Sequence, residues 1–313
     1  MTTPVDPTVT DPELVEPDED VDAAAEPTTT GTRRALFGGV FGGVTTSLWI
    51  GLGILVFIGL IGPIGSLFID VADTRLGAVG VLERPSLEHP LGTDTRGRDL
   101  LTIMVLAVPE TLKIGFIAGV VGLGVGLVLA LLAGYFGGTI DATIRVITDA
   151  VLTIPAIAVL VIIAANVPQM TVMIMGFTVA VLSWMQPTRM IRAQVLSIRE
   201  RAYIEVARVN GERPLGIVFK EVMPNLMPYI AASFVAAVAN ALLAAIGLEA
   251  LGLGANHQHT LGTTIYWAQS FAAVLRNAWW WWAPPIAMIS LIFIGLFLVS
   301  IGLDRIANPR LRK

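Results

Sequence analysis

Residues 35–69 read ALFGGVFGGVTTSLWIGLGILVFIGLIGPIGSLFI, a run of thirty-five residues without one charged side chain. About 20 apolar residues are enough for a helix to cross a bilayer, so this run predicts a transmembrane helix that ends near Pro63. Five more apolar runs reach that length, at roughly 109–134, 142–166, 171–196, 223–253 and 281–303. We therefore predict an all-α integral membrane protein with six transmembrane helices.

The composition of the 313-residue chain agrees with this class. Hydrophobic residues make up 55% of the chain and charged residues 14%, whereas soluble domains carry about 25% charged residues. A soluble enzyme is therefore disfavoured. The chain has no cysteine, which excludes disulfides, thiolate metal sites and a cysteine nucleophile.

Two regions of opposite charge add up to the net charge of −4. Residues 1–32 are rich in Pro and Thr and hold nine acidic and no basic side chains, so we expect a disordered acidic tail. Residues 33–313 hold 20 basic and 15 acidic side chains and form the predicted six-span domain. With the N-terminus in the cytoplasm, fourteen of these basic residues fall inside and six outside. The positive-inside rule thus predicts that both termini are cytoplasmic.

The predicted external loop, residues 64–108, contains the stretch HPLGTDTRGRD at residues 89–99. Glycine and proline punctuate it, which predicts turns. Asp94 and Asp99 could belong to a calcium-binding loop, but arginines stand where oxygen ligands would be needed. We expect instead that these aspartates form turns and cap the following helix.

A second polar segment, residues 197–225, is predicted to lie in the cytoplasm. Its charged residues recur at intervals of four, three and four, which would form a ridge of alternating charge on one helix face: Arg201, Glu205, Arg208 and Glu212. Gly211 predicts a helix stop, and Pro214 predicts the start of a second short helix with an apolar patch at residues 217–219. Such a hinged pair fits either a docking surface for a cytoplasmic partner or a solvated loop helix along the headgroups.

Four segments resemble motifs of the permease subunits of dipeptide/oligopeptide ABC transporters, and they occur in the family's order. They are residues 89–99, residues 205–211 together with 222–225, residues 251–254 and residues 302–312. The first resembles the HPLGTDxxGRD motif, and the second resembles the EAA loop of binding-protein-dependent permeases. Pro109 stands where the family often has arginine, and Glu249 stands where many peptide permeases have serine.

The resemblance implies a type I ABC importer permease fold in the plasma or inner membrane, where the chain forms half of a pore for dipeptides or oligopeptides. Related systems import oligosaccharides or other solutes, and a channel or scaffold subunit is the alternative from another class. The implied partners are a homologous second permease, two ATPase subunits and an extracellular or periplasmic solute-binding protein. Membrane lipid would surround the spans, and no nucleic acid is expected. The chain would be no enzyme and carry no cofactor, since ATP and Mg would bind the ATPases; it contains no GxxxxGK[ST] phosphate loop.

The resemblance also implies which residues carry the function. The ATPase-coupling residues would be Arg201, Glu205, Ala207, Arg208, Gly211, Glu212, Leu215, Phe219 and Pro224. The external motif contributes His89, Gly92, Asp94, Gly97, Arg98 and Asp99, and no metal site is expected.

Glu249, Asp149 and the tryptophans at residues 279–282 lie outside these motifs, and two of the three allow alternative roles. An acid within a span is costly, so Glu249 is expected either to anchor the span end at the interface or to lie on the substrate path. Asp149 is expected to pair with Arg145 on the same helix. The four tryptophans at residues 279–282 fit a position at headgroup depth or a buried aromatic plug.

Overall fold

A computed structural model of the chain describes residues 45–307. The predicted tail and the first part of the first predicted span lie outside these residues. Within them, the regular structure is helical apart from one isolated bridge between Thr93 and Asp99. The elements are α2 (Thr45–Gly65), η1 (Val71–Thr74), α3 (Leu100–Leu131), η2 (Leu132–Phe136), α4 (Gly138–Leu152), α5 (Ala156–Ala165), α6 (Val172–Ser183), α7 (Met185–Arg199), α8 (Ala202–Val209), α9 (Pro214–Ile217), η3 (Val218–Val222), α10 (Met223–Leu248), η4 (Glu249–Leu253), α11 (Leu261–Ser270) and α12 (Trp279–Ala307).

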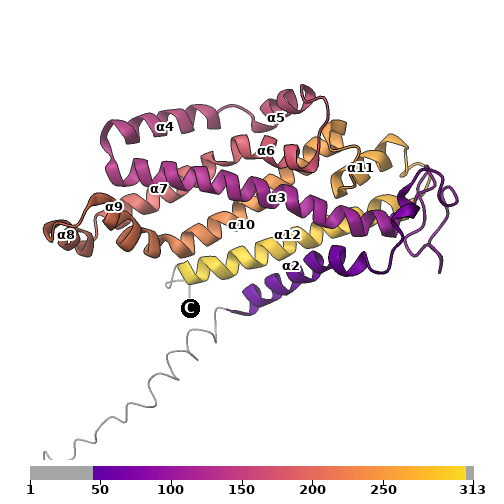
Figure 1. Cartoon of the computed structure of the whole chain (residues 1–313), viewed down its shortest axis with the longest axis horizontal. Helices are drawn as coiled ribbons and strands as arrows, with labels where there is room; N and C mark the ends of the chain where they lie inside the picture. Colours follow the sequence, from indigo (N-terminus) through magenta and orange to yellow (C-terminus); the bar gives the residue numbers. More distant parts are fainter. Residues whose placement is uncertain (1–44, 308–313) are drawn as a thin grey trace, which may run out of the picture. The chain divides into compact units, whose positions relative to one another are not determined.

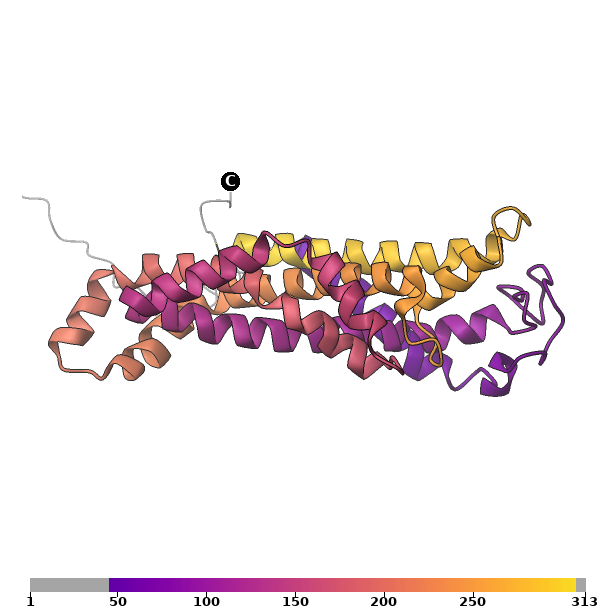
Figure 2. The ribbon, with the colours of Figure 1, turned by 90° about the horizontal axis from the view of Figure 1, so that it is seen from above.

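Helix α3 lies in the middle of the described bundle, where it packs against α6, α7 and α10, while α2 packs along α12 (Figure 1). Its buried residues Ile114, Leu123, Met104 and Ile103 each belong to a different hydrophobic cluster, so α3 joins all four clusters of the described residues. The turn between α8 and α9 lies at one end of the bundle, and the loop of residues 66–99 lies at the other end (Figure 1, Figure 2).

Glycines bring α2 and α12 into close contact. A Cβ atom on Gly51 would lie 2.8 Å from the carbonyl oxygen of Gly295, and one on Gly302 would lie 2.6 Å from Cβ of Leu48. Such distances are too short for a real side chain, so the contact requires glycine on both helices. Close backbone approach through small residues is a usual way for helices to associate in lipid.

Four described helical segments are long and apolar enough to cross a membrane: Thr46–Gly65, Leu100–Phe136, Pro214–Leu253 and Trp279–Ile306. Helices α4 and α5 are bent by 77° at a short break and would be a fifth crossing if they form one span. The span predicted at residues 142–166 is therefore not one straight helix but is divided between α4 and α5. Pro155 explains the break, because proline lacks a backbone donor and disfavours helical backbone in the residue before it. The predicted span at residues 171–196 is divided between α6, of twelve residues, and α7.

Helix α3 begins nine residues before the predicted start of its span. The side chain of Asp99 caps the helix, with Oδ1 accepting a hydrogen bond from the amide of Thr102 at 2.7 Å. Pro109 lies inside α3 rather than at its boundary. The predicted loop of residues 64–108 is therefore shorter, and we call its described equivalent, residues 66–99, the capping loop.

Candidate functional site

The segment of residues 197–225, here called the hinged loop, contains two helical parts that meet at Gly211. Helix α8 ends at Val209, and Gly211 has a φ of +77°, in the left-handed region that favours glycine. Pro214 is the first residue of α9, so the predicted hinge is confirmed. The second part is not short, however, because Pro214–Leu253 forms one helical segment of 40 residues.

The predicted ridge of alternating charge does not form. Helix α8 has only eight residues, so Arg201 is its N-cap residue and Glu212 lies beyond its end. Within residues 45–307, no ion pair joins these charged residues to one another. Glu212 instead accepts a hydrogen bond from Nζ of Lys220 at 2.6 Å. The guanidinium carbon of Arg208 lies 5.9 Å from the centre of the Tyr135 ring, a cation–π contact that holds α8 near η2.

Apolar side chains are exposed on both sides of the hinge. Leu215 and Phe219 are each 60% exposed. The predicted patch at residues 217–219 is wrong in part, because Ile217 and Val218 are buried in the cluster between α3, α7 and α10. The exposed residues, here called the apolar knob, are Val206, Val209, Leu215 and Phe219.

The other predicted coupling residues surround this knob. Glu205 is exposed on α8, and Ala207 is partly buried against the hydrophobic cluster beneath it. Pro224 is exposed in the first turn of α10. The hinged loop thus brings charged and apolar predicted residues onto one end of the bundle (Figure 1).

The capping loop at the opposite end is organised by Asp94. Its Oδ1 accepts hydrogen bonds from the amides of Arg96, at 2.8 Å, and Arg98, at 3.0 Å, and its Oδ2 accepts one from Nε of Arg98 at 2.7 Å. Asp94 is 0% and Arg98 7% exposed, so this ion pair is buried. Oδ2 of Asp99 lies 3.0 Å from Nδ1 of His89. The predicted turn-forming and capping roles of the two aspartates are confirmed.

Aromatic side chains at the start of α12 pack against the capping loop. Trp280 and Trp281 are buried, and Nε1 of Trp280 donates a hydrogen bond to the carbonyl oxygen of Thr93 at 3.3 Å. These two residues therefore form a buried plug, whereas Trp279 is exposed. Gly92 and Gly97, which lie in turns of the capping loop, both have a φ of +66°.

The guanidinium of Arg96 lies over the ring of Trp267, with its carbon 3.6 Å from the ring centre. Partial burial and the neighbouring Arg98 lower the pKa of the Arg96 guanidinium. Burial, together with Arg98, also lowers the pKa of the His259 imidazole, which favours its neutral form. Desolvation and the charge of Arg98 therefore act on the Arg96 and His259 side chains in the same direction.

Glu249 is fully buried where α10 passes into η4. Its Oε1 accepts a hydrogen bond from Oγ1 of Thr260 at 2.8 Å, and Thr260 is the N-cap residue of α11. Oγ1 of Thr111, on α3, accepts a hydrogen bond from the amide of Leu261 at 2.9 Å. A Cβ on Gly262 would overlap the Glu249 carboxylate. This cluster ties α10, α11 and α3 together.

Two substitutions of Glu249 separate these roles. Glu249→Gln keeps the volume and an oxygen acceptor for Thr260, so we expect the KM for solute uptake to stay within about two-fold of the parent value. Glu249→Ala removes the acceptor and leaves a cavity, and should lower the free energy of unfolding by about 2–4 kcal/mol. Uptake kinetics and thermal unfolding of the purified complex check both. A large rise in KM for the Gln variant at unchanged stability would instead assign a substrate contact to Glu249.

An ion pair that the sequence pattern did not predict joins α4 to α7. Nε and Nη2 of Arg192 donate to Oδ1 and Oδ2 of Asp141, the second at 2.6 Å. The predicted pair of Arg145 with Asp149 does not form in the described part of the chain. Asp141 and Arg192 are 51 residues apart, so helical spacing could not reveal their contact. The only available signal was the presence of an acid at the start of an apolar run.

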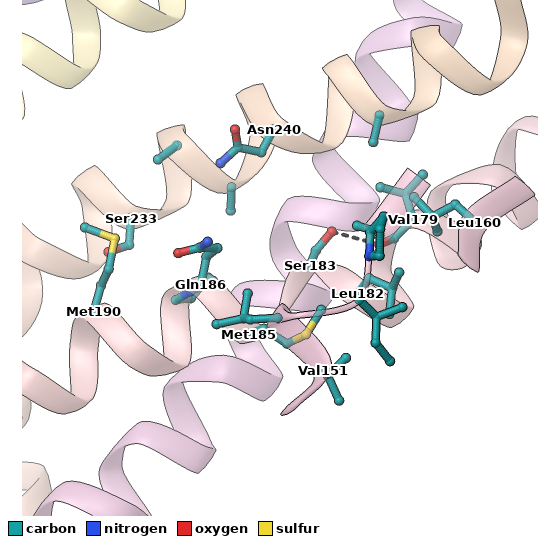
Figure 3. Close-up of a pocket in the computed structure, with 18 of the residues that line it drawn as sticks. Val151, Leu160, Val179, Leu182, Ser183, Met185, Gln186, Met190, Ser233 and Asn240 are labelled. Atoms are coloured by element: carbon teal, nitrogen blue, oxygen red, sulfur yellow. Dashed lines mark hydrogen bonds between the residues drawn. The ribbon is translucent and has the colours of Figure 1, made fainter. Parts of the chain in front are cut away.

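A cavity of about 510 Å³ opens between α5, α6, α7 and α10 (Figure 3). It is lined mainly by apolar side chains, and none of the charged residues within 45–307 contributes to its lining. The polar side chains that α6, α7 and α10 contribute to it are Ser183, Gln186, Ser233 and Asn240. No motif pointed to this site, because its polar residues are uncharged and widely separated in the sequence.

Comparisons with known proteins extend over most of the chain. The family described as "Binding-protein-dependent transport system inner membrane component" matches residues 126–313. The oligopeptide transport system permease protein OppC of Mycobacterium tuberculosis is 30% identical over 239 residues, covering 74% of this chain and 79% of that protein. The dipeptide transport system permease protein DppC of Alkalihalophilus pseudofirmus is 30% identical over 236 residues, covering 74% and 75%. A solved chain of the MetNI methionine ABC transporter in an inward-facing conformation is similar in fold, with a TM-score of 0.51 and 20% identity over 67% of this chain and 96% of that chain.

Proposed function

Because the chain belongs to the family of binding-protein-dependent transport system inner membrane components, we propose that it imports dipeptides or oligopeptides as one of two homologous permease subunits. It is a multi-pass membrane protein and the non-catalytic permease component of an ABC transporter. The names of its oligopeptide and dipeptide permease relatives support the peptide substrate. Oligosaccharides are the second candidate.

We propose six crossings within a permease domain of residues 33–313, with both termini in the cytoplasm. Helices α2, α3, α10 and α12 account for four crossings, and the bent pair of α4 and α5 accounts for one. Trp184 keeps right-handed helical backbone between α6 and α7, with φ of −80° and ψ of −23°, which supports counting this pair as the sixth. The excess of basic residues in the predicted internal segments supports the orientation.

The hinged loop is proposed to be the docking element for the ATPase subunits. The single observation that carries this role is the apolar knob, which is exposed beside charged side chains at the end of a helix that continues into the membrane. Exposed apolar patches with polar rims are typical of protein interaction sites. On this proposal ATP and Mg bind the ATPases, and the capping loop faces the solute-binding protein.

Uptake by reconstituted transporter tests both the docking role and the substrate. The change is Leu215→Ser combined with Phe219→Ser, which removes most of the apolar contact area. We expect the ATPases to be lost from the purified complex and ATP-driven peptide uptake to fall at least about ten-fold, because truncation of a docking anchor commonly costs 2 kcal/mol or more. Leu87→Ser is the matched control for ATPase retention, since Leu87 is equally an exposed leucine but lies on the capping loop at the other end of the bundle.

Two results would contradict the proposal. A double variant that keeps its ATPases and its uptake would remove the docking role from the knob. Parent transporter that accumulates an oligosaccharide such as maltotetraose, and not a peptide, would overturn the peptide substrate while leaving the importer intact.

A further inference from the structure

We propose that the cavity between α5, α6, α7 and α10 binds the main chain of the peptide during translocation, through neutral amide and hydroxyl groups. The inference rests on the proposed peptide import and names the site at which the permease itself holds the peptide.

The cavity contains polar groups that lack partners within the described residues. Oγ of Ser183 donates to the carbonyl oxygen of Val179 at 2.8 Å and is satisfied (Figure 3). The side chains of Gln186, Ser233 and Asn240 make no hydrogen bond to residues 45–307. Figure 3 shows Gln186 extending from α7 toward α10 and Asn240 projecting from α10 beside the same space. Gln186 and Asn240 are exposed, so their amide groups are open to hydrogen bonds with a polar molecule that enters the cavity.

The chemistry of these groups matches a peptide bond. Asparagine and glutamine each offer two N–H donors and a carbonyl acceptor. Every residue of a peptide, proline apart, presents one N–H donor and one C=O acceptor, whatever its side chain. The absence of charged residues from the lining means that neither a terminal amine nor a terminal carboxylate finds a counter-ion there. The cavity therefore fits the inner part of an extended peptide.

The apolar walls fit side chains of varied shape. Met185 and Met190 line the cavity together with Leu182 and Val179. Methionine is unbranched and flexible, so it adapts to different neighbours. A volume of about 510 Å³ lies within the range of about 300–1,000 Å³ that small-ligand pockets occupy. Within the described part of the chain no aromatic ring lines the cavity, so these residues provide no flat apolar surface on which sugar rings could stack.

The test compares uptake of tetraalanine with uptake of the same peptide N-methylated at one inner amide, by the complete transporter in proteoliposomes. The binding protein is identical in all samples, so a change in the uptake ratio of the two peptides comes from the permease. We expect Asn240→Leu and Gln186→Leu each to lower tetraalanine uptake roughly three- to ten-fold, as for one lost hydrogen bond. The uptake of tetraalanine divided by that of the N-methylated peptide should therefore fall in both variants. Asn240→Gln should retain the ratio, and Asn166→Leu, outside the cavity, is the matched control.

The outcomes separate the two proposals. Parent-like uptake ratios in both leucine variants would overturn the main-chain site while leaving peptide import intact. Loss of the second permease from the purified Asn240→Leu complex would assign these amides to the subunit interface and would also overturn the site. Parent transporter that imports neither tetrapeptide would overturn peptide import itself.

Discussion

A Gly211→Asp variant is expected to reach the membrane in normal amounts and to lose uptake by at least about ten-fold, since left-handed backbone costs a residue with a side chain about 1–2 kcal/mol. Gly211 holds the left-handed turn between α8 and α9 with a φ of +77°. A Cβ at this position would meet no atom within 4 Å, so the substitution does not disturb packing. The effect therefore falls on the turn and on the surface beside the apolar knob. ATP-driven uptake and membrane content measure it.

The chain offers a close control for this substitution. Gly77, in the capping loop, has a φ of +73° and equally open surroundings. Gly77→Asp imposes the same backbone strain and charge at the other end of the bundle, and should keep most of the uptake. Gly211→Asn removes the charge and is more tolerant of left-handed backbone, so it should be intermediate. Undiminished uptake by Gly211→Asp would remove the hinge from the coupling mechanism.

Asp94→Asn is expected to have the largest effect on stability. The substitution leaves the Arg98 guanidinium buried without its carboxylate, although both side chains stay in place. Breaking a buried ion pair on one side costs about 3–5 kcal/mol, against a total stability of about 5–15 kcal/mol for a typical domain. Thermal unfolding in detergent and the yield of folded protein should both fall sharply.

Glu88→Gln provides the comparison for that variant. Glu88 is exposed on the same loop, so the change in net charge is the same while no buried partner is lost. Its melting temperature should match that of the parent protein. If Asp94→Asn has the same melting temperature as Glu88→Gln, the buried ion pair of Asp94 and Arg98 contributes little to the stability of the protein.

Local signals in the sequence predicted several elements of the fold. The apolar runs located α2, α10 and α12, since the apolar length needed to cross a bilayer is a property of each segment alone. Asp99 was correctly predicted to cap α3, and Gly211 to end α8, because capping depends on residues within one turn.

Features that depend on contacts between distant segments could not be predicted in this way. The pair of Arg192 with Asp141 forms because α4 folds back along α7, and no periodicity encodes that approach. Glu212 was predicted to lie on the same helix face as Arg208. Because the helix ends before Gly211, Glu212 lies outside it and pairs with Lys220. The polar lining of the cavity is likewise assembled from helices far apart in the sequence, and only the tertiary structure shows that its amides share one space.

The helical segment Pro214–Leu253 has a mechanical consequence. Its 40 residues extend for about 60 Å at about 1.5 Å per residue. The Glu249 cluster fastens this rod to α11, and Leu215 and Phe219 of the apolar knob lie at its other end. If the rod tilts about Glu249, Asn240 travels about one quarter as far as Pro214, since displacement grows in proportion to the distance from the pivot at about 1.5 Å per residue. A displacement of the apolar knob would therefore move the α10 wall of the cavity in the same direction but over a shorter distance.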